Sequence, residues 1–227
     1  MRRLLIIALG LVMAACSTTD TRLAITQERP PATARVLVLQ PDVQLSVLLA
    51  AGGVDPKADW SLSGRDNLSQ EIQAVMATRS HPVTVIDAAT AQNGRIGQVL
   101  RLHEAVGDSI RAFEYSALRL PTHRNGFDWT LGDGAQTIGQ TYNADYALFT
   151  TARGTYSSSG RMAMFILAAA AGVSIPLGQQ YVFTSLVDLH TGRVVWFNVV
   201  IAGPAADMRT PEGARLLVAS VLEGVPL

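Results

Sequence analysis

The chain has 227 residues, of which 48% are hydrophobic and 16% charged, and its formal net charge is zero. This length allows one well-buried domain and is short for two. The balanced charge argues against a nucleic-acid partner, and the single cysteine, Cys16, excludes an internal disulfide and a cysteine-based metal site.

The first 15 residues have the pattern of a bacterial signal peptide. Arg2 and Arg3 form a short positive region, and an apolar run follows them. As a helix this run covers roughly 18 Å, which is too short to cross about 30 Å of hydrocarbon. Because Ala14 and Ala15 stand directly before Cys16, the segment resembles the lipobox of bacterial lipoproteins.

The lipobox resemblance implies cleavage before Cys16, a diacylglycerol on its sulfur and a further acyl chain, such as palmitate, on its new amine. Two or more chains are what stable anchoring needs. Ser17 after the cysteine is similar to the signal that sends lipoproteins to the outer membrane. We therefore expect a lipid-anchored outer-membrane protein that faces the periplasm. The alternative is an ordinary cleaved leader followed by a chance cysteine.

Residues 16–34 are polar and contain Pro30-Pro31, which indicates a tether between the lipid and a single domain at 35–227. The elements expected first are strands at 35–39 and 43–49, a helix from Ser63 to Arg79, a strand at 83–86 and a helix at 91–117. Gly107-Asp108 is a possible break in the second helix.

The second half of the domain is dense in strand-forming residues. It is expected to contain a strand at 144–151, an apolar insert at 162–178, hairpin arms at 181–189 and 194–201, and a closing helix that Thr210 caps. Gly192 in the hairpin turn can supply a positive φ. The order of elements predicts an α/β (α+β-like) fold with a mixed sheet, a C-terminal antiparallel hairpin, packed helices and an apolar helical insert.

Two short motifs resemble a group of envelope lipoprotein domains. The first, small-Ala-Asp-Tyr, occupies residues 143–146, and the second, Asp-x-x-Thr-Gly-x-x-x-Trp, occupies residues 188–196. Both are similar to the α/β domains of the curli-secretion lipoprotein, the lipoprotein activators of penicillin-binding proteins and the Tol translocation protein. The resemblance implies a protein that binds other proteins or assembles, and it carries over no catalytic residues.

Direct signs of chemistry are weak. The histidines at 81, 103, 123 and 190 are far apart, no His-Glu-x-x-His motif is present, and no Gly-x-Ser-x-Gly elbow occurs. Asp188 and His190 are two residues apart, but an exposed turn explains them more simply than a metal pair. We therefore predict no catalytic, cofactor-binding or metal-binding residues.

Two segments are candidate contact surfaces. Residues 121–129 mix polar side chains with His123, Phe127 and Trp129, which suits recognition, and a plain connecting loop is the alternative. The uncharged insert offers a second set, Met162, Phe165, Ile166 and Ile175, which either packs into its own domain or meets a partner, a second copy or lipid.

The sequence favours a non-catalytic outer-membrane lipoprotein that acts by protein–protein contact in envelope assembly or maintenance. Its partners would be membrane lipid through acylated Cys16, and envelope proteins or copies of itself. One alternative is an enzyme acting on cell wall or lipid, with a pocket near His123, Asp128 and Trp129. Another is an oligomeric export component.

Overall fold

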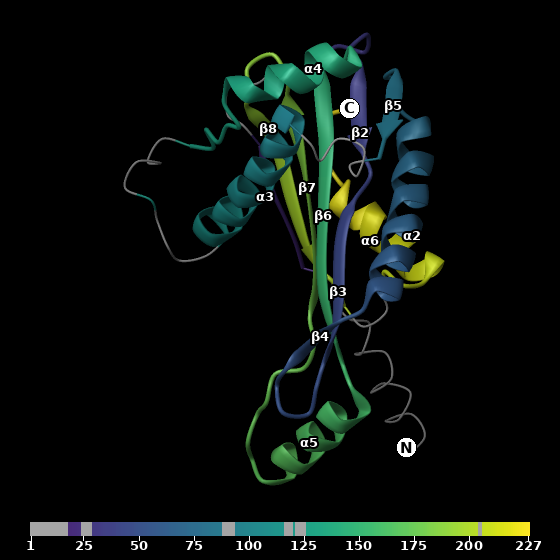
Figure 1. Ribbon diagram of the computed structural model, residues 1–227, viewed down its shortest axis with the longest axis vertical. Coiled ribbons are helices and arrows are strands. Elements are labelled where there is room, and N and C mark those ends of the chain that lie inside the picture. The colour runs from purple at the N-terminus through teal and green to yellow at the C-terminus, as the bar shows by residue number, and fades with distance from the viewer. Residues whose placement is uncertain (1–17, 24–28, 88–93, 116–119, 121–125, 204–205) are drawn as a thin grey trace, which may run out of the picture.

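The computed structural model describes residues 29–87, 94–115, 120, 126–203 and 206–227, together with the backbone of residues 18–23. A mixed sheet forms its centre, helices cover both faces, and a narrow projection extends from one end (Figure 1). The predicted α/β fold with helices packed on a mixed sheet is confirmed.

The sheet has the strand order β1-β8-β7-β6-β2-β5, and β3 and β4 extend it at one end. The strands are β1 (Thr18–Leu23), β2 (Val36–Leu39), β3 (Asp42–Leu48), β4 (Val54–Pro56), β5 (Val83–Ile86), β6 (Tyr146–Ser157), β7 (Gln180–Asp188) and β8 (Val194–Ile201). The 12-residue β6 is long enough to pair with β2 along its first part and with β3 along its second. Antiparallel pairing of β7 with β8 confirms the predicted hairpin.

The helices are α2 (Ala58–Ala77), α3 (Gly94–Glu114), α4 (Gln136–Tyr142), α5 (Ser159–Ala170) and α6 (Pro211–Val221), with a 3-10 turn, η2 (Asp133–Ala135), before α4. α2 and α6 cover one face of the sheet, whereas α3 and α4 cover the other (Figure 1). Thr210 accepts a hydrogen bond from the N–H of Gly213 and caps α6 as predicted, with Pro211 at the first helical position.

The core consists of two apolar layers, because successive strand side chains point to opposite faces. On one face Leu68, Ile72 and Met76 of α2 and Leu217 and Val221 of α6 pack against a sheet surface that contains Leu148 and Trp196. On the other face Val99 and Ile110 of α3 and Ile138 of α4 pack against Phe149, Phe183 and Phe197. Both layers are continuous under the helices.

Residues 18–23 differ from the expectation of a tether. They form β1, which pairs antiparallel with β8 from Thr18↔Ile201 to Leu23↔Trp196. Three of the six residues are threonines, whose β-branched side chains suit a strand despite their polarity. Pairing with β1 also covers an edge of β8 that would otherwise expose its backbone polar groups.

Two helix predictions need correction. α2 begins at Ala58, and Ser63, expected at the helix start, lies inside it and donates its hydroxyl to the carbonyl of Asp59. α3 runs unbroken through Gly107, where a Cβ atom would lie 2.6 Å from Cε2 of Phe183. Gly107 therefore lets α3 approach the sheet closely.

Candidate functional site

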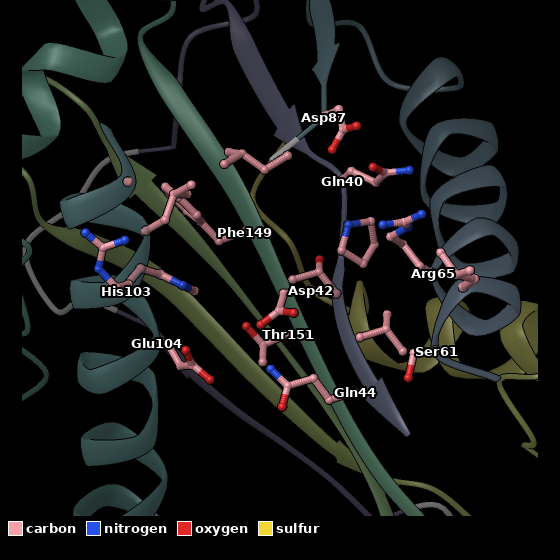
Figure 2. A pocket seen from close by; sticks show the side chains of 18 of the residues that line it. Gln40, Asp42, Gln44, Ser61, Arg65, Asp87, His103, Glu104, Phe149 and Thr151 are labelled. Carbon is pink, nitrogen blue, oxygen red and sulfur yellow. The ribbon is translucent and has the colours of Figure 1, made fainter. Parts of the chain in front are cut away.

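A cleft of about 620 Å³ opens between α2 and α3, at the carboxyl ends of β2 and β5 (Figure 2). It forms because these parallel strands end at Leu39 and Ile86, while β4 first pairs with β3 at Ser46. Between these points the outer edge of β3 has no strand partner within the described part of the chain. Carboxyl ends of parallel strands are a common position for ligand sites.

The cleft has an apolar floor and polar walls. Leu39, Leu100 and Phe149 are apolar lining residues, while the polar lining side chains come from α2, α3, β3 and the ends of β2 and β5: Ser61, Arg65, Arg101, Glu104, Asp42, Gln44, Gln40 and Asp87. In Figure 2 the α2 and α3 side chains lie on either side of the β3 side chains. A few polar groups over an apolar floor are typical of a binding site.

Arg153 of β6 holds two of the cleft carboxylates in place. Its guanidinium lies 2.6 Å from Oδ2 of Asp42 and also donates a hydrogen bond to Glu104 of α3. Burial opposes the charge of Arg153, but both carboxylates together raise its pKa. The acidic groups on this side of the cleft are therefore fixed by a partly buried cation.

Arg65 on the facing α2 wall differs, because its Nε atom is buried and has no hydrogen-bond acceptor among the described residues. Oδ1 of Asp66 lies 3.7 Å away, which is an ion-pair distance but too long for a hydrogen bond. The side chain as a whole is 34% exposed, so the cleft wall presents the positive charge of Arg65 while its Nε atom is covered.

His103 lines the cleft but is part of the protein interior. Its side chain is buried, its ring stacks on Phe149 at a centroid distance of 4.3 Å, and its Nε2 lies 2.5 Å from Oγ of Ser185. Burial lowers the pKa of His103 to about 3, so the imidazole is neutral at pH 7. Its arrangement suits packing of α3 on the sheet rather than proton transfer near neutral pH.

A second surface, the apolar tip, consists of residues 49–54, which are the turn after β3 and the first residue of β4, and residues 159–179, which include α5. No side chain of α5 is buried. The large hydrophobic side chains that the tip exposes are Leu49, Val54, Met162, Met164, Ile166, Leu167, Val173 and Leu177. α5 and the turn between β3 and β4 lie at the opposite end of the long axis from α4 (Figure 1).

Arg161 gives the apolar tip a defined structure. Its guanidinium Nε and Nη2 donate to the carbonyl of Pro176 at 3.1 and 2.8 Å, and its Nη1 donates to the carbonyl of Ala50 at 3.4 Å. Oγ of Ser158 caps α5 by accepting from the Arg161 N–H. Arg161 of α5 therefore links the helix both to Pro176 in the same segment and to Ala50 in the other segment of the tip.

No family model matches the chain, and no curated protein does. Solved structures similar to it include the PelC dodecamer from Paraburkholderia phytofirmans, at 14% identity and a TM-score of 0.39, covering 91% of this chain and 95% of that one. The LpoB C-terminal domain from Salmonella enterica gives 12% identity, a TM-score of 0.26 and coverages of 73% and 80%. Lipoprotein GNA1162 from Neisseria meningitidis gives 11%, 0.30, and coverages of 75% and 82%. These scores carry no functional argument.

The two motifs at residues 143–146 and 188–196 contain aspartates whose carboxylates make hydrogen bonds that stabilise the fold. The carboxylate of Asp145 accepts hydrogen bonds from the backbone N–H, Nε and Nη2 of Arg35, and these bonds keep the pKa of Asp145 well below its usual range. The carboxylate of Asp188 accepts from the His190 N–H at 2.8 Å and from the Thr191 hydroxyl at 2.7 Å, which closes the hairpin turn. Asp188 and His190 thus belong to the turn as expected, but only His190 is exposed, because Asp188 is 6% exposed and its carboxylate bonds to the turn.

The predicted contact residues of the insert are at the surface. Met162 and Ile166 are 42% and 61% exposed, and Phe165 and Ile175 are half-buried. The alternative of an insert packed into its own core is therefore wrong, whereas the contact role itself stays a prediction. The helix of the insert begins at Ser159 and ends at Ala170, so residues 173–179 continue outside it.

In the loop at residues 121–129, which was predicted to be a recognition surface, the two aromatic side chains are buried. Phe127 and Trp129 are 6% and 8% exposed and belong to the core layer under α3, where Nε1 of Trp129 donates to Oε1 of Glu114. α3 covers these rings, and burial of large aromatic side chains is favourable. His123 and Cys16 lie outside the described residues. Asp128 and Trp129 are not among the residues that line the cleft.

The cleft is not evident from the sequence, because its residues come from segments up to 112 positions apart, from Leu39 to Thr151. One signal was available. Gln40 and Asp87 come directly after the apolar runs of β2 and β5, where parallel strands place their ends together. Within the described residues, no group of three or more His, Cys, Asp or Glu side chains is placed to hold a metal ion.

Proposed function

We propose that this protein is a non-catalytic lipoprotein of the outer membrane, anchored through acylated Cys16, whose cleft binds a segment of another envelope protein. The lipobox-like sequence before Cys16 supports the anchor and the periplasm-facing location. The contact takes place at the cleft between α2 and α3, not at the loop before Trp129.

The observation that carries the binding role is the cleft itself, in which Arg65 on α2 faces the carboxylates of Asp42 and Glu104. The Arg65 side chain is 34% exposed, so a carboxylate or backbone carbonyl of a partner segment would pair with its guanidinium. Asp42 and Glu104, fixed by Arg153, offer acceptors on the other side, and Leu39 and Phe149 offer apolar contact. This mixture suits a peptide with both polar and apolar side chains.

Two cleft residues that resemble catalytic groups have structural roles, which supports a non-catalytic function. His103 is neutral and packed against Phe149. Oγ of Ser61 donates to the carbonyl of Lys57 and accepts from the Leu45 N–H, so it covers the edge of β3. The hydroxyl of Ser61 and the ring of His103 are therefore each engaged with structural partners, and not with each other as a nucleophile and its base.

The anchor is tested by labelling cells with radioactive palmitate. The wild-type chain should incorporate label and fractionate with the outer membrane, and Cys16→Ser should incorporate none and appear as soluble periplasmic protein or uncleaved precursor. A Cys16→Ser chain that is processed and remains quantitatively in the outer membrane would show that the lipoprotein assignment is wrong.

The cleft is tested by in-cell photocrosslinking. A benzoylphenylalanine at exposed Gln44 in the cleft should give one discrete protein adduct, and the same group at exposed Gln140 on α4 is the matched control. Arg65→Ala should reduce the Gln44 adduct at least fivefold because the partner loses its donor. Identical adducts from both positions, or an unchanged yield in Arg65→Ala, would contradict binding at the cleft.

A further inference from the structure

The apolar tip has almost no charge. Arg161 is the only charged residue between Arg153 and Asp188, and none occurs between Asp42 and Asp55. The guanidinium of Arg161 donates to the carbonyls of Pro176 and Ala50, so the charge of the tip is hydrogen-bonded to the tip's own backbone. Most of the other large side chains that the tip exposes are apolar, and they come from two separate segments of the chain.

Exposed hydrophobic side chains cover more than half of the circumference of α5. Met162, Met164, Ile166 and Leu167 are each at least 42% exposed, and at 100° per residue they spread over an arc of roughly 200°. The remaining arc carries Arg161, Phe165 and Ala168, which are partly covered. An apolar arc this broad on a projecting element favours immersion in a membrane surface over docking of a single partner on one narrow stripe.

The position of the anchor points to the same end of the molecule. Thr18 pairs with Ile201, Ile201 with Tyr181, and Tyr181 with Arg153, so the start of β1 is level with Arg153 of β6. β6 continues four residues to Ser157, about 13 Å further, before α5 begins. Cys16 is two residues from Thr18, and two residues of chain span at most about 7 Å.

The lipid anchor is therefore attached at the tip end of the sheet, by a stretch of chain too short to extend past α5. With the long axis upright, a membrane that holds the acyl chains of Cys16 must also meet α5. No helix within the described residues has the length and hydropathy to cross a bilayer. The 12 residues of α5 span about 18 Å, which suits an element immersed in one leaflet.

We propose that the apolar tip inserts into the phospholipid surface that holds the lipid anchor, as a second membrane attachment that sets the domain upright. The inference rests on the anchoring of Cys16 in the proposed function. Insertion at two points fixes the orientation of the domain and directs the end of the sheet near α4 away from the membrane, as the long axis in Figure 1 shows.

The test uses the mature chain from residue 16 with Cys16→Ser, which carries no acyl chains and no cysteine. A new cysteine at Leu167 in α5, labelled with an environment-sensitive dye, should show a blue shift and a severalfold increase of emission with vesicles of phosphatidylethanolamine and phosphatidylglycerol at about 3:1. The same dye on Gln140→Cys in α4 is the control and should not respond, because it lies at the opposite end.

A second measurement compares vesicle partition of two double variants. Ile166→Asp/Leu167→Asp on the tip should reduce partition at least tenfold, whereas Leu102→Asp/Leu216→Asp changes two other exposed leucines, on α3 and α6, and should leave it unchanged. Circular dichroism melting confirms that both variants are folded. Equal partition of the two variants, or no response of the Leu167→Cys dye, would overturn the proposal.

Size-exclusion chromatography with light scattering tests the alternative that a second copy of the chain, rather than lipid, covers the tip. An oligomer that Ile166→Asp/Leu167→Asp dissociates, with no vesicle binding by the wild-type tip, would assign the tip to a second copy and overturn insertion into lipid. The vesicle assay uses unacylated protein, so it is independent of palmitate labelling and of the Gln44 crosslink. Failure of those two experiments would refute the proposed function without changing the vesicle result.

Discussion

Replacing Gly192 with alanine should destabilise the protein more than the same substitution at a positive-φ glycine in an open turn. Gly192 has a φ of +73°, which is unfavourable for an L-residue by about 1–2 kcal/mol. In addition, a Cβ atom there would lie 2.2 Å from the carbonyl oxygen of Gly132. The two backbones must separate by roughly 1 Å to restore ordinary van der Waals contact.

That separation acts on the hydrogen bonds between the hairpin turn and the segment before η2. The Leu131 N–H donates to the carbonyl of Gly192 at 2.7 Å, and the Val194 N–H donates to the carbonyl of Trp129 at 2.9 Å. Weakening both contributes about 2 kcal/mol at roughly 1 kcal/mol each. The total loss for Gly192→Ala is therefore about 3–4 kcal/mol, of which about half comes from the contact with Gly132.

Gly224→Ala is the matched control, because Gly224 has a φ of +71° and a Cβ atom added there would have nothing within 4 Å. It should show the conformational cost alone. Thermal unfolding followed by circular dichroism should place the Tm of Gly192→Ala about 4–8 °C below that of Gly224→Ala, at roughly 2–4 °C per kcal/mol for a chain of this size. Equal Tm values would show that the close approach to Gly132 has no energetic effect.

Three further predictions concern the interior and the tip. The unfolded chain protonates His103 below its ordinary pKa of about 6.5, whereas burial keeps the folded chain from protonating it until about pH 3. Lowering the pH from about 6 to about 4.5 should therefore reduce the free energy of unfolding of wild type by about 2 kcal/mol more than that of His103→Gln. Urea titration at each pH measures this difference. Gly107→Ala should lower stability by about 1–3 kcal/mol although alanine favours helix, and Phe183→Leu should rescue part of the loss in a double-mutant cycle; additive effects would contradict the contact. Replacing residues 162–178 with a short Gly/Ser linker should change the Tm by less than about 3 °C because no α5 side chain is buried, and loss of cooperative unfolding would refute that description.

The sequence predicted several elements almost to the residue. β5 spans Val83–Ile86 as expected, and the hairpin of β7 and β8 has the predicted arms and turn. These segments combine alternating or continuous apolar residues with strong turn signals, so local preference and burial agree. The cap of α6 by Thr210 is likewise a local feature, because its hydroxyl bonds to a backbone N–H three residues away.

The burial of apolar segments was not decided locally. Residues 162–178 are mostly apolar, as are Phe127 and Trp129, yet no side chain of α5 is buried whereas the aromatic pair is in the core. Composition cannot distinguish them, because burial depends on whether another element covers the side chain. α3 covers Phe127 and Trp129, whereas within the described residues no helix packs over α5.

Short-range patterns were sufficient to predict the fold class, the positions of the main strands and the lipobox-like segment. Only the tertiary structure brought Asp42, Arg65, Glu104 and Arg153 to one cleft, because β6 pairs with β3 across more than a hundred residues of chain. It also added β1 to the sheet and so placed Thr18 at the end where α5 projects. Long-range strand pairing sets such distances, and no local pattern encodes them.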